Sequence, residues 1–95
     1  VVISPRSDAS GLNNPNPTYP AMSRRLAEQG KVLLEVLILA NGTVGEIKLK
    51  QSSGFKRLDD AALQTVKQWR FQPAKRGNQA IDYWYIQPIS FSLDT

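Results

Sequence analysis

Apolar and polar residues in the middle of the chain follow the two-residue period of β-strands. Residues 31–51 contain two such stretches on either side of Asn41 and Gly42, a pair that favours the type I′ turn of a two-residue hairpin. This turn places Ala40 opposite Thr43, so that apolar positions face apolar positions across the two strands. The expected pairs are Val36 with Ile47, Leu34 with Leu49 and, on the other face, Glu35 with Lys48.

A short first helix is predicted from the segment PAMSRRLAEQG, residues 20–30. Pro20 stands at its first position and Gly30 just past its end, as is typical of helix boundaries. Met22 and Leu26 are four residues apart, so they should share one face.

A second, amphipathic helix is predicted from Leu58 to Trp69, because Leu58, Ala62, Val66 and Trp69 form one apolar stripe. Its first turn contains two acidic residues and its last turn two basic ones, each matching the sign of the helix dipole. These residues are Asp59, Asp60, Lys67 and Arg70.

The last alternating stretch runs from Ile81 to Leu93 and contains Pro88. It is longer than an average strand, so we expect a bend or bulge near Gln87 and Pro88. Because proline has no backbone N–H for a sheet ladder, this strand is predicted to lie at a sheet edge.

These elements predict an α+β domain of element order αββαβ, with two helices on one face of a three-stranded sheet. The second helix carries the chain back to the top of the sheet, so the last strand should run parallel to the second strand. Its expected place is beside the first strand, giving the strand order 2-1-3. The last strand also carries Trp84 and Ile86, which should leave part of the helix-free face apolar and exposed.

The chain is predicted to have two regions. Residues 1–18 are dense in Ser, Pro, Asn and Gly, as expected for a flexible arm or linker. Residues 19–95 form the folded domain. No run of about 18 apolar residues occurs, so no transmembrane helix is predicted.

Composition argues against an enzyme. Neither Cys nor His occurs among the 95 residues, which removes disulfides, thiol chemistry, His-dependent triads and the usual zinc sites. The glycines do not form a phosphate-binding pattern. Twelve Lys and Arg against eight Asp and Glu give a net charge of +4, which is common in ordinary solvated domains. We therefore expect no catalytic residue, cofactor or metal.

Two kinds of binding surface can be considered. Tyr83, Trp84 and Tyr85 with Arg76 are candidates for an RNA platform, but the basic residues are scattered and the tyrosines fit a core, so nucleic acid is not expected. Alternatively, a partner's extended segment could add a strand to the exposed edge of the last strand, a mode called β-augmentation. From composition alone, an edge that is simply exposed, or covered by the arm or by a second copy of the chain, is favoured.

Several motifs change this balance. They are TYP at 18–20, GKV at 30–32, NG at 41–42 and, most specific, SSGFKRLDDAALQTVKQWRFQPA at 52–74. Together they resemble the C-terminal domain of TonB-family energy transducers of Gram-negative bacteria, over residues 19–93.

The resemblance implies a mechanical rather than an enzymatic role. Proteins of this family are held in the inner membrane by an N-terminal segment, which is absent from this chain, cross the periplasm and work with the motor proteins ExbB and ExbD. Their C-terminal domain binds the TonB box, a short segment of outer-membrane receptors for iron complexes or cobalamin, as a strand added along the last strand. Peptidoglycan is a possible further partner, and both a monomer and a strand-exchanged homodimer stay open.

The resemblance and the edge argument together place the partner-binding residues on the last strand and just before the TYP motif. They are Asn14, Asn16, Ile81, Tyr83, Trp84, Tyr85, Ile86, Gln87, Pro88, Ile89, Ser90 and Phe91. The alternative is a periplasmic TolA-like or TonB-paralogue domain with a different partner. Pro88 should interrupt the added strand, so Pro88→Val is expected to raise the affinity for a box peptide or to shift its register.

Overall fold

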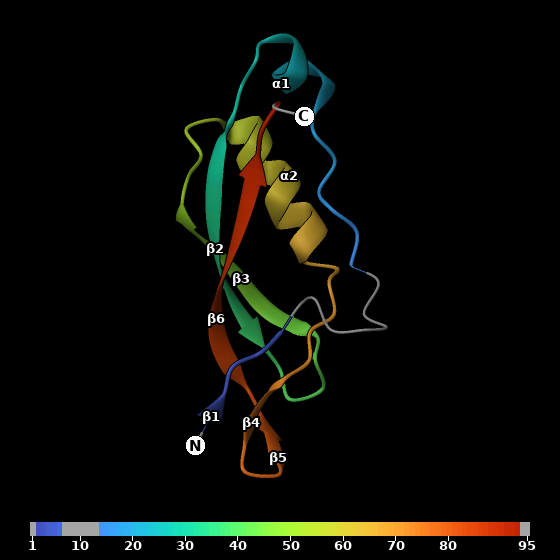
Figure 1. Ribbon diagram of the computed structural model, residues 1–95, viewed down its shortest axis with the longest axis vertical. Helices are drawn as coiled ribbons and strands as arrows, with labels where there is room; N and C mark the ends of the chain where they lie inside the picture. Colours follow the sequence, from blue (N-terminus) through green and yellow to red (C-terminus); the bar gives the residue numbers. More distant parts are fainter. Residues whose placement is uncertain (1, 7–13, 94–95) are drawn as a thin grey trace.

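The computed structural model describes residues 2–6 and 14–93 (Figure 1). In this part of the chain, two helices accompany two small antiparallel sheets. The elements in chain order are β1 (Val2–Ile3), α1 (Ala21–Arg25), β2 (Gly30–Ile38), β3 (Val44–Gln51), α2 (Lys56–Val66), β4 (Ala74–Arg76), β5 (Gln79–Ile81) and β6 (Tyr83–Phe91).

The larger sheet has the strand order β3-β2-β6, and β2 runs antiparallel to both neighbours. This is the order predicted for the three long strands. The predicted αββαβ scheme is nevertheless incomplete, because β1, β4 and β5 form a second sheet in the order β1-β4-β5. The α+β class is right, but the prediction of a single sheet was wrong.

The second sheet escaped prediction because its strands are two or three residues long. A segment of that length has no measurable hydrophobic period. β4 and β5 form a hairpin around Gly77, and β1 pairs with β4 through Val2 opposite Arg76. Ile81 therefore ends β5 and does not belong to the long last strand.

The loop between β2 and β3 has three residues rather than the predicted two. The Leu39 N–H donates to the Thr43 carbonyl at 2.9 Å, so Thr43 opposes Leu39 and not Ala40. Gly42 has φ +87°, the positive value that a three-residue hairpin loop requires. A bulge at Gly45 then restores the register. The predicted pairs are therefore confirmed: Leu34–Leu49, Glu35–Lys48 and Val36–Ile47.

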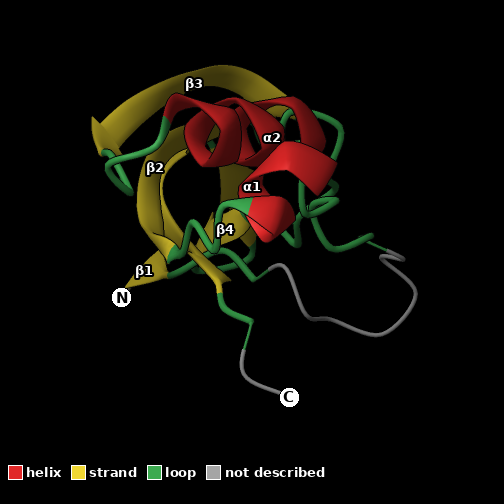
Figure 2. Cartoon of the chain, turned by 90° about the horizontal axis from the view of Figure 1, so that it is seen from above, coloured by secondary structure: helices red, strands yellow, loops and turns green. Residues whose placement is uncertain are grey.

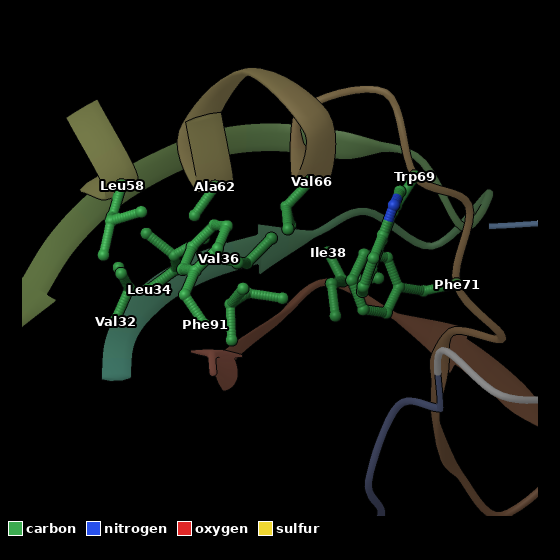
Figure 3. Close-up of a cluster of buried hydrophobic side chains, with 11 residues drawn as sticks. Val32, Leu34, Val36, Ile38, Leu58, Ala62, Val66, Trp69, Phe71 and Phe91 are labelled. Carbon is green, nitrogen blue, oxygen red and sulfur yellow. The ribbon is translucent and has the colours of Figure 1, made fainter. Parts of the chain in front are cut away.

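The hydrophobic core lies between the sheet and α2, which covers one of its faces (Figure 3). Alternate residues of β2 point into it, and α2 contributes a stripe at positions 58, 62 and 66. Seen from above, the sheet curves around both helices (Figure 2). The fully buried residues of β2 and α2 are Val32, Leu34, Val36, Ile38, Leu58, Ala62 and Val66.

Helix α2 ends at Val66, three residues earlier than predicted, so Lys67 is its C-cap and Arg70 lies beyond it. Trp69 is still buried against the core, but from the loop that follows. Asp59 lies in the first turn, yet its carboxylate accepts hydrogen bonds from the preceding loop rather than acting only on the helix dipole.

Helix α1 is only five residues long and lies at one end of the sheet (Figure 1). The chain leaves it through Ala27, which has φ +55°, so the helix ends well before Gly30, which belongs to β2. Met22 and Leu26, the predicted apolar face, are exposed. The buried residue of α1 is Ser23. Two apolar residues four apart were too weak a pattern to identify the buried face.

Strand β6 pairs with β2 over nine consecutive residue pairs in one register. The predicted bulge near Gln87 and Pro88 is therefore absent from this ladder, which the structure describes from Gly30–Phe91 to Ile38–Tyr83. The alternative, a bend at the same place, stays a prediction. On the helix-free face, Trp84 and Ile86 are 41% and 37% exposed, as predicted. The Lys48 ammonium lies 5.1 Å from the Trp84 ring centroid and covers part of this patch.

Described residues before position 19 contact the rest of the molecule. Arg6 forms a β-bridge with Gln72, and Asn14 binds the backbone of Arg70. The predicted boundary between an arm at 1–18 and a domain at 19–95 stays a prediction. Within the described part of the chain, neither helix is long and apolar enough to cross a membrane.

Candidate functional site

The outer edge of β6 presents the backbone groups of alternate residues. Since the Leu39 N–H donates to β3, the odd-numbered residues of β2 also direct their N–H and C=O groups toward β3. These residues oppose the even-numbered residues of β6. The backbone groups of Trp84, Ile86, Pro88 and Ser90 therefore point away from β2, toward the open side of the sheet.

Among the residues that the structure describes, no strand pairs with this side of β6. An open strand edge is a template for pairing with another extended segment. The opposite edge strand, β3, carries Glu46, Lys48 and Lys50, which are exposed charges of the kind that discourage such pairing.

Pro88 fits into β6 because its nitrogen faces the open edge. It lies opposite Leu33, whose backbone groups are directed at β3, so the ladder between β2 and β6 needs no N–H from this position. Its outward carbonyl accepts a hydrogen bond from Nε2 of Gln87 at 3.1 Å. The proline thus removes a donor only from the side where a partner would pair.

A groove of about 440 Å³ lies beside the C-terminal half of β6. Trp69, Ile89 and Phe91 give it buried apolar walls, whereas Asn16 and Gln87 contribute polar groups. The lining residues are Asn16, Pro17, Tyr19, Trp69, Gln87, Pro88, Ile89, Ser90, Phe91 and Ser92. A segment added to the β6 edge would therefore have a mixed apolar and polar groove beside it.

The segment before α1 forms one wall of the groove, and side-chain hydrogen bonds hold it in place. The Asn14 side chain accepts from the Arg70 N–H at 2.9 Å and donates to the Arg70 carbonyl at 2.7 Å. The Trp69 indole N–H donates to the Pro15 carbonyl at 2.7 Å. The wall is therefore attached to the loop after α2.

Tyr19 closes the same wall against β6, with its ring 5.4 Å from that of Phe91 in an edge-to-face contact. The Tyr19 hydroxyl donates to the Glu28 carbonyl. The Glu28 carboxylate in turn accepts from the Ser23 hydroxyl at 2.8 Å and pairs with Arg57 at 3.1 Å. Glu28 therefore links α1, α2 and Tyr19 around one end of the groove.

The loop before α2 is fastened by Asp59. Burial raises the pKa of this carboxyl group, but hydrogen bonds from Ser52 and Ser53 and the charge of Lys56 outweigh burial and hold the pKa below its ordinary value. The Ser53 N–H lies 2.9 Å from the carboxylate. Asp59 thus has a structural role.

A second hollow, of about 550 Å³, lies near the start of α2 and is lined by charged residues that are already paired. Lys56 pairs with Asp60 at 2.8 Å, and Arg57 with Glu28. Among the described residues, no cluster of three or more carboxylates could hold a metal ion.

The structure brings together part of the predicted partner-binding set. Asn16 and residues 87–91 line the groove. Asn14 does not line it but binds the Arg70 backbone, and Ile81 lies in the second sheet. Residues 83–86 lie on β6 outside the groove, and the backbone groups of Trp84 and Ile86 are directed at its open edge. Sequence reasoning missed Pro17, Tyr19, Trp69 and Ser92; the TYP motif was the one signal that pointed near them.

Comparison with known proteins identifies the family. Residues 15–93 match the model of the family described as Gram-negative bacterial TonB protein C-terminal. The chain belongs to this family. The resemblance seen in the TYP, GKV and SSG to WRFQPA motifs is thereby confirmed.

Individual members of the TonB family are similar over much of the chain. Protein tonB2 of Pseudomonas aeruginosa is 48% identical over 90 residues, 95% of this chain and 33% of its own length. Protein TonB of Vibrio cholerae is 33% identical over 78 residues, 82% of this chain and 32% of its own length. The chain thus spans about a third of the length of these relatives.

The solution NMR structure of the Pseudomonas aeruginosa TonB CTD has the same fold. It superimposes with a TM-score of 0.74 over 93% of this chain and 92% of its own, at 22% sequence identity. A TonB C-terminal domain therefore has the α+β arrangement of two helices and a sheet described above.

Proposed function

We propose that this chain is the receptor-binding domain of a TonB-type energy transducer, and that it binds the TonB box of outer-membrane receptors as a strand added to β6. The single observation that carries the proposal is the open edge of β6, with its outward backbone groups beside a groove of about 440 Å³. Membership of the TonB C-terminal family supports the choice of partner. No chemical step is involved in this role.

An added strand suits a transducer that serves several receptors. Backbone hydrogen bonds along an edge give affinity that depends little on the partner's sequence, while the groove can read alternate side chains. A pulling force would be shared over several ladder bonds. The groove residues Asn16 and 87–91 are the proposed contacts, together with the edge at Trp84 and Ile86.

The cellular setting is proposed from the family. The domain would work in the periplasm, attached to the inner membrane by an N-terminal segment outside this chain, where ExbB and ExbD supply energy for the uptake of iron complexes or similar nutrients. The basic residues of α1, Arg24 and Arg25, are exposed and could meet acidic receptor residues or peptidoglycan. The β6 edge would also accept a second copy of the chain by strand exchange.

NMR titration of the labelled domain with TonB box peptides tests the proposal. We expect chemical-shift changes along β6 and at Asn16, and smaller ones along β3. Absence of changes with every box peptide, together with strong changes on addition of single-stranded RNA, would overturn it.

Two substitutions at Ser90 provide a matched control for the edge. Ser90→Pro removes an outward N–H without affecting the ladder to β2, so it should weaken peptide binding roughly tenfold, as expected for one lost hydrogen bond. Ser90→Ala removes the hydroxyl but keeps the N–H, so it should weaken binding less than Ser90→Pro does. Equal affinity of both variants would exclude pairing at this position.

A further inference from the structure

Gln87 is a polar side chain in an apolar row. It lies on the helix-side face of β6 between Tyr85 and Ile89, and only 8% of its surface is exposed. It lines the groove together with Trp69 and Pro88. A buried amide in such a place normally has partners for both of its polar atoms.

Only one end of the Gln87 amide is satisfied. Its Nε2 donates to the Pro88 carbonyl at 3.1 Å, which determines the orientation of the amide because a carbonyl can only accept. Its Oε1 is buried, and no described residue donates to it. An unpaired buried acceptor is unfavourable, so the folded state would gain from a ligand that brings a donor to this amide.

The same place is the weak point of the β6 edge. An added strand needs an N–H and a carbonyl from each outward residue. At position 88 the N–H is missing, while the carbonyl already accepts one hydrogen bond from Gln87. The neighbouring outward residues, Ile86 and Ser90, keep both groups. A partner strand would therefore find one donor missing from the ladder, with the Gln87 amide beside the missing group.

We propose that the Gln87 side chain replaces the missing backbone N–H of Pro88 when a partner strand binds. An amide nitrogen has two hydrogens, so Nε2 can donate to a carbonyl of the incoming peptide as well as to Pro88. As the amide turns toward the edge, its Oε1 accepts an N–H of the same peptide. Gln87 is thus a specificity-determining residue that sets the register of an extended peptide across Pro88; this inference rests on the proposed function.

A double-mutant cycle in the complete domain tests this role, with the affinity for one TonB box peptide measured by calorimetry. Gln87→Leu should weaken binding roughly tenfold, the effect of one uncharged hydrogen bond. In the Pro88→Val background, where the backbone N–H is restored, the same substitution should weaken binding by less than about threefold. Gln87→Met, which is unbranched and apolar, is the control for a disturbance of the packing by Leu. It should give the same two results.

The outcomes separate this inference from the proposed function. One outcome is that Gln87→Leu and Gln87→Met bind the peptide like the unchanged domain, and another is that they lose affinity by the same factor in both backgrounds. In either case Gln87 does not replace the Pro88 N–H, while β-augmentation stands. If the unchanged domain binds no box peptide, the proposed function fails, and this role of Gln87 fails with it. Urea unfolding of each variant should show undiminished stability, since an unpaired buried polar group has been removed.

Discussion

Gly42→Ala should destabilise the domain through a contact between the hairpin loop and the loop after α2. Gly42 has φ +87°, and a Cβ atom at this position would clash with the Phe71 carbonyl oxygen. That oxygen belongs to the backbone and cannot rotate away. The Phe71 N–H also donates to the Gly42 carbonyl at 2.8 Å, so any displacement that relieves the clash strains this hydrogen bond.

The magnitude follows from two effects. A non-glycine residue with positive φ costs about 1–3 kcal/mol. Losing the hydrogen bond adds roughly 0.5–1.5 kcal/mol. Gly54→Ala is the matched control, because Gly54 has φ +98° but no described atom lies within 4 Å of its added Cβ. The control should show the backbone effect alone.

Urea unfolding followed by tryptophan fluorescence measures both variants. We expect Gly42→Ala to lower the free energy of unfolding by about 1 kcal/mol more than Gly54→Ala does. If the two substitutions have the same effect, the contact between Gly42 and Phe71 contributes nothing and the reasoning fails. Because Phe71 packs against Trp69, with ring centroids 6.2 Å apart, the contact also supports the groove.

Two further predictions concern the groove wall and acid stability. Asn14→Ala should expose the amide of Arg70 to hydrogen exchange and weaken box-peptide binding severalfold, because two hydrogen bonds that hold the wall are lost. Asn16→Ala should affect binding but not that exchange. The stability that Asp59 contributes should be complete above about pH 4 and lost as the pH falls through its lowered native pKa. The difference in urea midpoint between the unchanged domain and Asp59→Asn should therefore shrink from pH 6 to pH 3.

Each of these predictions has a result that would contradict it. Unchanged exchange of the Arg70 amide in Asn14→Ala would show that the wall is held by other contacts. A difference in urea midpoint that stays constant between pH 6 and pH 3 would mean that the Asp59 carboxylate does not favour the ionised form in the folded domain.

The hairpin shows how a prediction can be right in one part and wrong in another. The pairing of Glu35 with Lys48 was predicted correctly, because the alternating pattern places complementary side chains opposite each other. The predicted turn length was wrong, because it depends on the bulge at Gly45. Glycine has no side chain, so it adds nothing to the alternating pattern. The bulge and the longer loop cancel in the register.

The sequence by itself determined the three long strands, the buried stripe of α2 and the edge position of β6. These features depend on local periodicity and on the missing N–H of Pro88, and both follow from the amino-acid sequence alone. The TonB family could likewise be recognised from motifs.

Only the tertiary structure decided which residues form the groove beside the β6 edge. The groove combines Asn16, Trp69 and Gln87, which are far apart in sequence and meet through the pairing of β2 with β6 and the attachment of the segment before α1. Contacts between residues far apart in the sequence cannot be predicted from local periodicity, and neither can the unpaired Gln87 oxygen. Pro88 predicted that β6 lies at a sheet edge. The position of the Gln87 side chain beside it, and of the segment before α1 as a wall of the groove, required the tertiary structure.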